Sequence, residues 1–506
     1  MLSLRHRYLI TACVSIAIII TVFVILYFSN GIYTKLLRHP SGVIALEIAD
    51  SIVNQFDVFR IFQRSPLPAN SYVNLELSGS DVQYITRQID RFIQYGHIPD
   101  RFKSWRKGAM HLDGKSVEIS YRFHGTSVTP LRRGGFSLRI RHEEDVDYRE
   151  LMRSYNLITS KDDADISTIW INQLAENIGL ISPHGKMVIF RINGVDLGLY
   201  MMVEELEAER LERNHGITNY TIIKAIDDWD KKSNNHRSAL DLWVGNQEVS
   251  GTAINSDVAL GAFNLLTEAI LGNDLSTIRR LLNLEYMAKF MALGALINNS
   301  HPITGDNLRY IYDFSTGEFS ILFRIEDTIL PLTSTVEDFN SSWFNTPIDY
   351  RDSETHELFR LLLQDAEFRH LRDQELHNIL QAGDAISKDA RSVYARNHPV
   401  ILHSSEPRRR YNHDRDVAFA TLNRNLETIE NYLNYTKIFV NQVVKNGQLT
   451  ASILNDSFHK VSLEGAILEK QPHETTVFQR EIPSHSLNAE LRLDHKVTEI
   501  DLPESS

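Results

Sequence analysis

The chain has 506 residues, a formal net charge of −12 and one cysteine, Cys13. The acidic balance excludes general nucleic-acid binding, which requires a basic surface. One cysteine excludes an intramolecular disulfide and a cysteine zinc cluster. The sequence also lacks HExxH and GxSxG motifs, so nothing in it supports a zinc protease or an α/β-hydrolase.

An uncharged apolar run covers residues 8–28. About 20 such residues are enough to cross a membrane as a helix. The alternative is a cleaved signal peptide, but its apolar region is shorter, about 7–15 residues, and ends in small residues. We therefore expect residues 1–34 to be a tail and a single transmembrane anchor. The globular region would face the periplasm or the cell exterior of a bacterium, and residues 35–70 would connect the two.

Apolar spacing of three and four residues predicts a helix over 81–95. Alternation predicts strands over 117–123 and 136–141. A further helix is expected to start at Asp165 and to stop at Gly179, which are suitable capping residues.

A hairpin is predicted over 187–203, because Asn-Gly between apolar strands favours a type I′ turn. A second hairpin is expected across residues 315–317. Helices are predicted over 204–213, 276–298, 354–382 and 414–445, and short strands over 449–454 and 461–468. Strands and helices do not alternate regularly, which favours an α+β fold over a doubly wound parallel sheet.

The segment 124–135 contains glycines together with Arg132 and Arg133. Glycines allow close approach of a ligand to the backbone, and the arginines could neutralise phosphate. The alternative is a surface loop with solvated arginines.

Two carboxylate-bearing segments lie at neighbouring hairpin ends: Asp306-Asn307 and Glu326-Asp327. Oxygen ligands of this kind hold divalent cations, and a carboxylate can serve as base for a hydroxyl nucleophile. Each segment can also be read as an ordinary turn or strand end.

The order of several blocks resembles the spore-coat CotH family of atypical protein kinases, over roughly residues 115–330. The blocks are Arg122-x-His124-Gly125-x-Ser127, the loop with Arg133, Ile192-Asn193-Gly194-x-x-x-Gly198-Leu199-Tyr200-x-x-x-Glu204, and Asp306-Asn307-x-x-Tyr310 with Thr316-Gly317-x-Phe319. Arg133 stands where the family usually has lysine. Phe323-Arg324-Ile325-Glu326-Asp327 replaces the family's W-D-x-D strand end.

The resemblance implies a two-lobed kinase-like α+β domain behind the transmembrane helix. The N-lobe-like region would be 71–205, the C-lobe-like region 206–445, and a small β appendage 446–506. ATP with Mg²⁺ or Mn²⁺ would be the cofactors.

The resemblance also implies roles for single residues. Arg133 and Glu204 would bind the nucleotide, and Asp306 would be the catalytic base or a metal ligand. Asn307 and either Glu326 or Asp327 would bind metal. A structural role for Glu204 at the start of the next helix is the alternative.

Two functions follow. The first is transfer of phosphate from ATP to a hydroxyl group of a protein or an envelope glycan. The alternative is a catalytically inactive, membrane-tethered scaffold in envelope or surface-polymer assembly, favoured by the altered strand end. The membrane itself and an envelope protein or glycan would be the partners, without nucleic acid.

Overall fold

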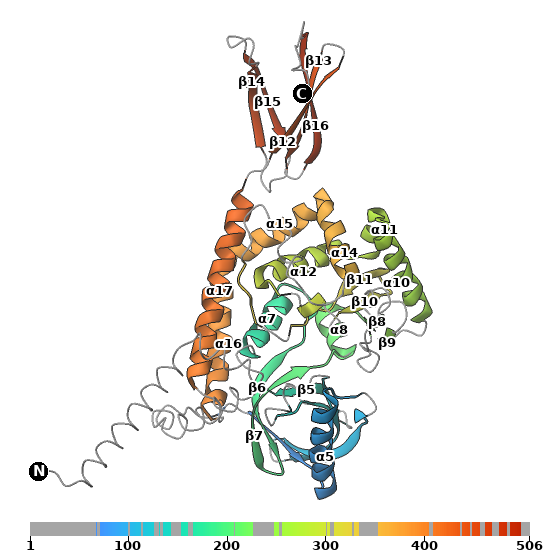
Figure 1. The fold of residues 1–506 in the computed structure, drawn as a ribbon, viewed down its shortest axis with the longest axis vertical. Helices are drawn as coiled ribbons and strands as arrows, with labels where there is room; N and C mark the ends of the chain where they lie inside the picture. The colour runs from blue at the N-terminus through green and yellow to red at the C-terminus, as the bar shows by residue number, and fades with distance from the viewer. Residues whose placement is uncertain are drawn as a thin grey trace, which may run out of the picture.

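A computed structural model describes the fold (Figure 1). The described residues are 67, 71–99, 102–112, 115–125, 131, 135–142, 153–159, 165–206, 208–225, 247–251, 256–299, 301–303, 308–325, 328–332, 353–403, 408–435, 438–445, 448–455, 461–467, 475–482 and 486–496.

Seven strands close into a barrel in the order β1-β2-β3-β4-β5-β7-β6. They are β1 (Tyr72–Glu76), β2 (Arg106–Leu112), β3 (Lys115–Phe123), β4 (Leu138–His142), β5 (Ser154–Thr159), β6 (Gly185–Ile192) and β7 (Val195–Glu204). Neighbours pair antiparallel except β1 and β6, whose parallel pairing closes the barrel, with Tyr72 opposite Ile189 and Leu75 opposite Ile192.

Alternate side chains of these strands fill the barrel, as period-2 alternation requires. Tyr121, Leu138 and Tyr155 are among the buried interior residues. Helix α5 (Gly79–Tyr95) packs on this core through the fully buried Phe92. The helix starts at the N-cap Ser78 and ends at Gly96, whose φ of 77° is left-handed. The helix predicted over 81–95 is therefore confirmed.

The predicted Asn-Gly hairpin is also confirmed between β6 and β7. Asn193 and Gly194 have φ values of 50° and 78°, as a type I′ turn requires. The Asn193 side chain accepts a hydrogen bond from the Leu77 N–H (2.9 Å) and donates one to the Leu77 carbonyl (3.0 Å). The turn thereby also fixes the chain that leaves β1.

The remaining described chain up to residue 435 is mostly helical and surrounds a small sheet. The sheet has the order β11-β10-β8-β9, formed by β8 (Tyr220–Ala225), β9 (Gln247–Gly251), β10 (Arg309–Asp313) and β11 (Glu318–Ile321). The helices are α7 (Asp165–Asn177), α8 (Ala208–His215), α10 (Ser256–Leu271), α11 (Leu275–Leu281), α12 (Leu284–Ile297), α14 (Ser353–Gln364), α15 (Ala366–Gln381), α16 (Gly383–His403) and α17 (Arg408–Asn434).

The outer face of β6 and β7 belongs to the core of this helical part. Met187, Met201 and Val203 are buried in one apolar cluster with Trp170 of α7 and Phe290 of α12. Side chains of β7 therefore alternate between two cores, because neighbouring residues of a strand point to opposite faces.

Beyond α17 the chain forms five more strands, which Figure 1 draws apart from the barrel. They are β12 (Ile438–Lys445), β13 (Gln448–Asn455), β14 (Val461–Ile467), β15 (Thr475–Ile482) and β16 (Ser486–Lys496). β12, β13 and β16 form one sheet, and β14 pairs with β15.

The structure contradicts the predicted fold class. A two-lobed kinase-like α+β domain behind a transmembrane helix was expected, but the structure has a closed seven-stranded barrel joined to a helical part with its own sheet. The predicted hairpins pair neighbouring strands, whereas the barrel closes through β1 and β6, for which the sequence has no local signal.

The predicted single-pass membrane protein, with its extracytoplasmic globular region, is contradicted as well. Within the described ranges, none of the helices combines the length and the apolar composition that a membrane span requires. The predicted anchor, residues 1–34, lies outside the described residues.

Four predicted helices have different bounds. The helix expected over 354–382 is divided at Asp365, the N-cap of α15. The helix expected over 414–445 is part of α17 and ends at Asn434, and residues 438–445 form β12 instead. In place of the helix expected over 204–213, β7 ends at Glu204 and α8 starts only at Ala208. The helix expected over 276–298 is interrupted between α11 and α12, where the Asn283 side chain accepts a hydrogen bond from the Tyr286 N–H (3.0 Å). Asn283 thereby acts as an N-cap and starts a new helix.

Candidate active site

Two adjacent glutamates stand at the end of β7, and they face different parts of the molecule. Tyr200 and Met202 point into the barrel core, whereas Met201 and Val203 point into the helical core. Continued alternation directs Glu205 towards the helical part. Its side chain is 13% exposed.

Glu205 is held on the barrel side by β4 and β5. The Arg139 Nη2 lies 2.7 Å from Glu205 Oε1. The Asn156 side-chain amide donates to the same oxygen and accepts a hydrogen bond from Arg139 Nε (3.1 Å). Asn156 is fully buried, so these three side chains form a closed polar network.

Two further arginines reach Glu205 from the helical part. The Arg309 Nη1, from β10, lies 3.5 Å from Oε2, and the Arg324 Nη1, just after β11, lies 3.9 Å from Oε1. The Arg324 side chain is 5% exposed. We call Glu205 with Arg139, Arg309 and Arg324 the arginine cluster. It joins the barrel to the helical part through charge.

The arginine cluster keeps Glu205 ionised. Burial by itself raises the pKa of this carboxyl, but the charges of Arg139, Arg309, Arg324 and His124 act in the opposite direction and hold the pKa well below its ordinary value. A buried carboxylate is stable only when it is paired in this way.

Three segments singled out from the sequence lie a few residues along the chain from members of the cluster or from His124. The loop with Arg133 follows His124, residues 304–307 precede Arg309, and residues 326–327 follow Arg324 by two positions. Consecutive Cα atoms are about 3.8 Å apart. The flanks of all three segments thus meet around one carboxylate.

Of the predicted site residues, the structure describes Glu204. Its Oε2 accepts a hydrogen bond from the His184 N–H (3.4 Å), and its own N–H donates to the His184 carbonyl (2.9 Å). The nucleotide-binding role proposed for Glu204 stays a prediction. The other predicted residues lie outside the described residues: Arg133, Asp306, Asn307, Glu326 and Asp327.

The sequence reading missed Glu205 and Arg139. Glu205 stands in an acidic stretch that reads as the start of a solvated helix. Strand alternation was the available signal: with Met201 and Val203 pointing into the helical core, Glu205 belongs on the same side.

The arginine cluster contains groups of the kind that bind phosphate. Guanidinium groups bind phosphate oxygens through paired N–H donors. In the sequence, Arg309 and Arg324 are the cluster members closest to the two carboxylate-bearing segments, 306–307 and 326–327. Among the described residues, no group of three or more His, Cys, Asp or Glu side chains could hold a metal ion. The metal site predicted at Asn307 with either Glu326 or Asp327 lies outside the described residues and stays a prediction.

Comparison with known proteins gives one family. The family model described as "CotH kinase protein" matches residues 121–440, which include the end of β3, β4 to β7, the arginine cluster and α7 to α17. No curated protein matches the chain. The match covers more than half of the chain and all the segments that flank the cluster.

Proposed function

The chain belongs to the CotH kinase protein family, and from this premise we propose that it is a phosphotransferase that moves a phosphoryl group from ATP to a hydroxyl group of a protein or glycan. The observation that carries the proposal is the arginine cluster, on which the flanks of three candidate catalytic segments converge. Positioning and charge neutralisation account for most of the catalysis in such transfers.

In the proposed reaction the bond between the β- and γ-phosphates breaks and a phosphate ester forms at the acceptor oxygen, with ADP leaving. ATP with Mg²⁺ or Mn²⁺ supplies the phosphoryl group and part of the charge compensation. Asp306 would take the proton of the acceptor hydroxyl. Arg309 and Arg324 would stabilise the phosphate charge, and Glu205 would hold both arginines in place.

One observation favours a second candidate, a protein with this fold and without catalysis. Arg324 stands where the family pattern has a carboxylate. Its Nη1 lies 3.9 Å from Glu205 Oε1, so its guanidinium is already paired with a carboxylate of the chain itself. If neither Glu326 nor Asp327 completes the metal site, the chain would act by binding alone.

The experiment that separates the two candidates is the thermal stability of the full chain with ATP and Mg²⁺ or Mn²⁺, beside a γ-phosphate transfer assay. A ligand present at 100 times its Kd stabilises the folded state by about 2.7 kcal/mol. We expect a metal-dependent rise of Tm that is lost in Asn307→Ala, at a residue proposed to bind metal, and kept in Asp90→Ala, a change on the exposed face of α5. Phosphate transfer should be lost in Asp306→Ala, at the proposed base.

The outcomes are distinct. A shift together with phosphate transfer supports the phosphotransferase. A shift without transfer supports the second candidate. No shift at millimolar nucleotide, with the protein well folded, would overturn the proposed ATP site.

A further inference from the structure

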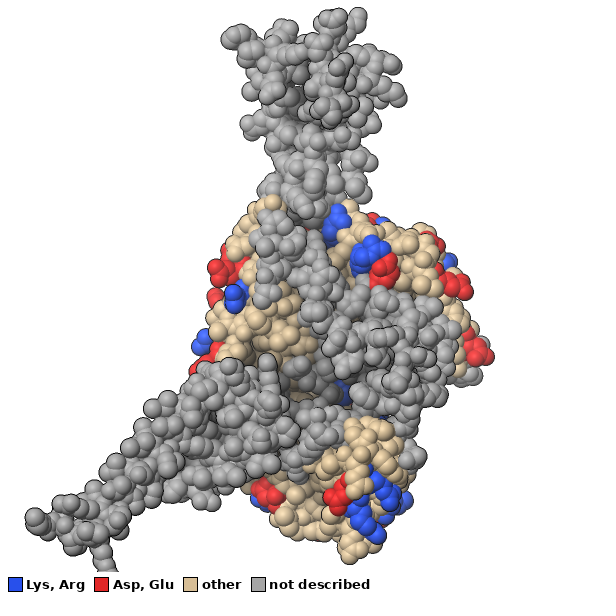
Figure 2. All heavy atoms as spheres, in the orientation of Figure 1, with Lys and Arg blue, Asp and Glu red and all other residues tan. Residues whose placement is uncertain are grey.

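Helix α5 and the first four strands of the barrel lie in a positively charged stretch of an acidic chain. Residues 71–142 contain 12 Lys and Arg against 6 Asp and Glu, a net charge of +6, whereas the whole chain carries −12. Figure 2 shows Lys and Arg gathered at the barrel end of the molecule, near the position of α5 in Figure 1. A separation of charge on this scale indicates a surface for an anionic partner.

Strand register places part of this charge on one outer face of the barrel. Arg122 of β3 lies opposite Arg139 of β4, and Ser120 lies opposite both Arg141 of β4 and Lys107 of β2. Residues directly opposite each other share a face of the sheet. We call Lys107, Arg122 and Arg141 the basic stripe.

The basic stripe runs into the arginine cluster. Arg139 is both the cross-strand neighbour of Arg122 and a partner of Glu205. Arg141 is two residues further along β4, roughly 7 Å away at the usual rise of a strand. The stripe therefore leads from the candidate active site to the outer surface of the barrel.

The stripe is accessible, and one of its arginines is held in position. Lys107 and Arg141 are exposed, and Arg122 is half-buried. The Arg122 guanidinium lies 4.7 Å from the ring centre of Trp105, which is itself 40% exposed. This cation–π contact orders the side chain before a partner binds, which reduces the entropy lost on binding.

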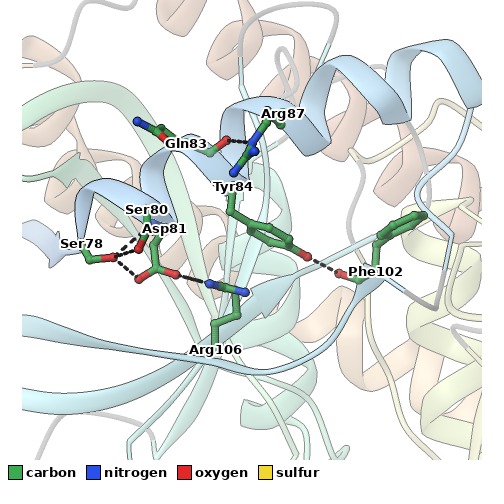
Figure 3. Close-up of polar contacts among 8 residues, drawn as sticks. All are labelled: Ser78, Ser80, Asp81, Gln83, Tyr84, Arg87, Phe102 and Arg106. Carbon is green, nitrogen blue, oxygen red and sulfur yellow. Dashed lines mark hydrogen bonds and ion pairs between the residues drawn. The ribbon is translucent and has the colours of Figure 1, made fainter.

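Arg106, next to Lys107 in β2, is not part of the stripe, because it pairs with an acidic residue of α5. Figure 3 shows Arg106 turned towards Asp81 at the start of α5, with Asp81 Oδ1 2.6 Å from Nη2 and 2.8 Å from Nε. The Arg106 guanidinium also lies 4.2 Å from the ring centre of Tyr84. The other oxygen of Asp81, Oδ2, accepts a hydrogen bond from the hydroxyl of the N-cap Ser78 (2.6 Å). Arg106 therefore anchors α5 to the barrel.

We propose that the basic stripe docks an acidic peptide segment of the protein whose hydroxyl group is phosphorylated. The identification of this partner as the substrate rests on the proposed function, whereas the binding itself does not require catalysis. Carboxylates of an extended segment would pair with Arg122 and Arg141, and the segment would direct a neighbouring Ser or Thr towards the arginine cluster. Glu118, exposed on the same face opposite Ala109, bounds the stripe.

The dimensions and aromatic content of the stripe favour a short peptide over nucleic acid. It covers three neighbouring strands, roughly 10 Å from the first to the third. The ring of Trp105 is in contact with Arg122, which competes with the base stacking that single-stranded nucleic acids require. The net charge of −12 also opposes a long polyanion.

The test measures binding to the full chain without ATP, by fluorescence anisotropy. The probe is a labelled peptide with a central serine between runs of glutamate, compared with the same peptide carrying glutamine and with a single-stranded oligonucleotide. The variant is Arg122→Glu with Arg141→Glu. The control is Arg87→Glu, the same charge change at an exposed residue of α5. Arg141→Gln provides a milder change, and Tm is measured for each variant.

We expect the acidic peptide to bind, the glutamine peptide to bind at least tenfold more weakly, and the double variant to raise the Kd of the acidic peptide by tenfold or more. Arg141→Gln should raise it about threefold and Arg87→Glu less than twofold. Equal binding to the wild type and the double variant, no binding of the acidic peptide, or tighter binding of the oligonucleotide would each overturn the docking proposal. None of these results would alter an ATP-dependent rise of Tm, so failure of docking is distinguishable from failure of the proposed phosphotransferase.

Discussion

Replacing Glu205 by glutamine removes the single carboxylate from the arginine cluster while keeping the side-chain size and an oxygen that accepts from Asn156. Removal of one partner of a buried ion pair costs about 3–5 kcal/mol, because the other charge stays buried. Arg139 is 21% exposed and Arg309 12%, so water screens part of the remaining charge. We therefore expect the lower end, about 3 kcal/mol, of lost unfolding free energy at pH 7.

Urea unfolding followed by tryptophan fluorescence, to which the buried Trp170 contributes, measures this loss. The matched control is Glu204→Gln, which removes a neighbouring, half-exposed carboxylate and should cost less than about 1 kcal/mol. Because the folded-state pKa of Glu205 is depressed, its contribution is fully present above the ordinary pKa of 4.5. It is lost as the pH falls through the folded-state value.

The difference between wild type and Glu205→Gln should therefore shrink below pH 4.5. Equal stability of the two proteins at pH 7, or a loss no larger than that of Glu204→Gln, would refute the view that Glu205 holds the three arginines together.

Three further predictions concern the barrel. Burial lowers the pKa of His142 to about 4 from 6.5, so unfolding free energy should fall as the pH drops from 6.5 to 4; His142→Leu should make this fall smaller in a urea titration against pH. Asn193→Gly keeps the positive φ and loses both bonds to Leu77, so Tm should decrease, with a cost of about 1–3 kcal/mol; no change would mean that the turn alone fixes this junction. A methyl group at Gly135 would collide with the Thr159 hydroxyl, so Gly135→Ala should cost about 1–3 kcal/mol, partly restored by adding Thr159→Ala, as calorimetry can show.

Features encoded by neighbouring residues were predictable from the sequence. The Asn193-Gly194 turn depends on the φ preferences of two residues, and α5 depends on local spacing and on caps at Ser78 and Gly96. The break at Asn283 was also encoded locally, by a good N-cap residue, but the surrounding apolar run concealed it.

Features that depend on distant pairing were not predictable. The closure of the barrel requires β1 to meet β6 in parallel, and no turn residue signals such a contact. The burial of Glu205 depends on Arg139, 66 residues earlier, and on Arg309 and Arg324, far later in the chain. In the sequence the same glutamate looks like one of several surface charges. The family resemblance pointed to loops along the chain from His124, Arg309 and Arg324, whereas the carboxylate that these residues share required the structure.

The parallel pairing of β1 and β6 has a consequence for synthesis of the chain. The contacts that close the barrel join Leu77 to Asn193 across 116 residues. A ribosome adding about 5–20 residues per second needs roughly 6–23 s to make that stretch. During this time β1 has an open edge, and open strand edges promote aggregation. Fragments that contain β1 and end before β6 would keep that edge unpaired, so we expect such fragments to aggregate.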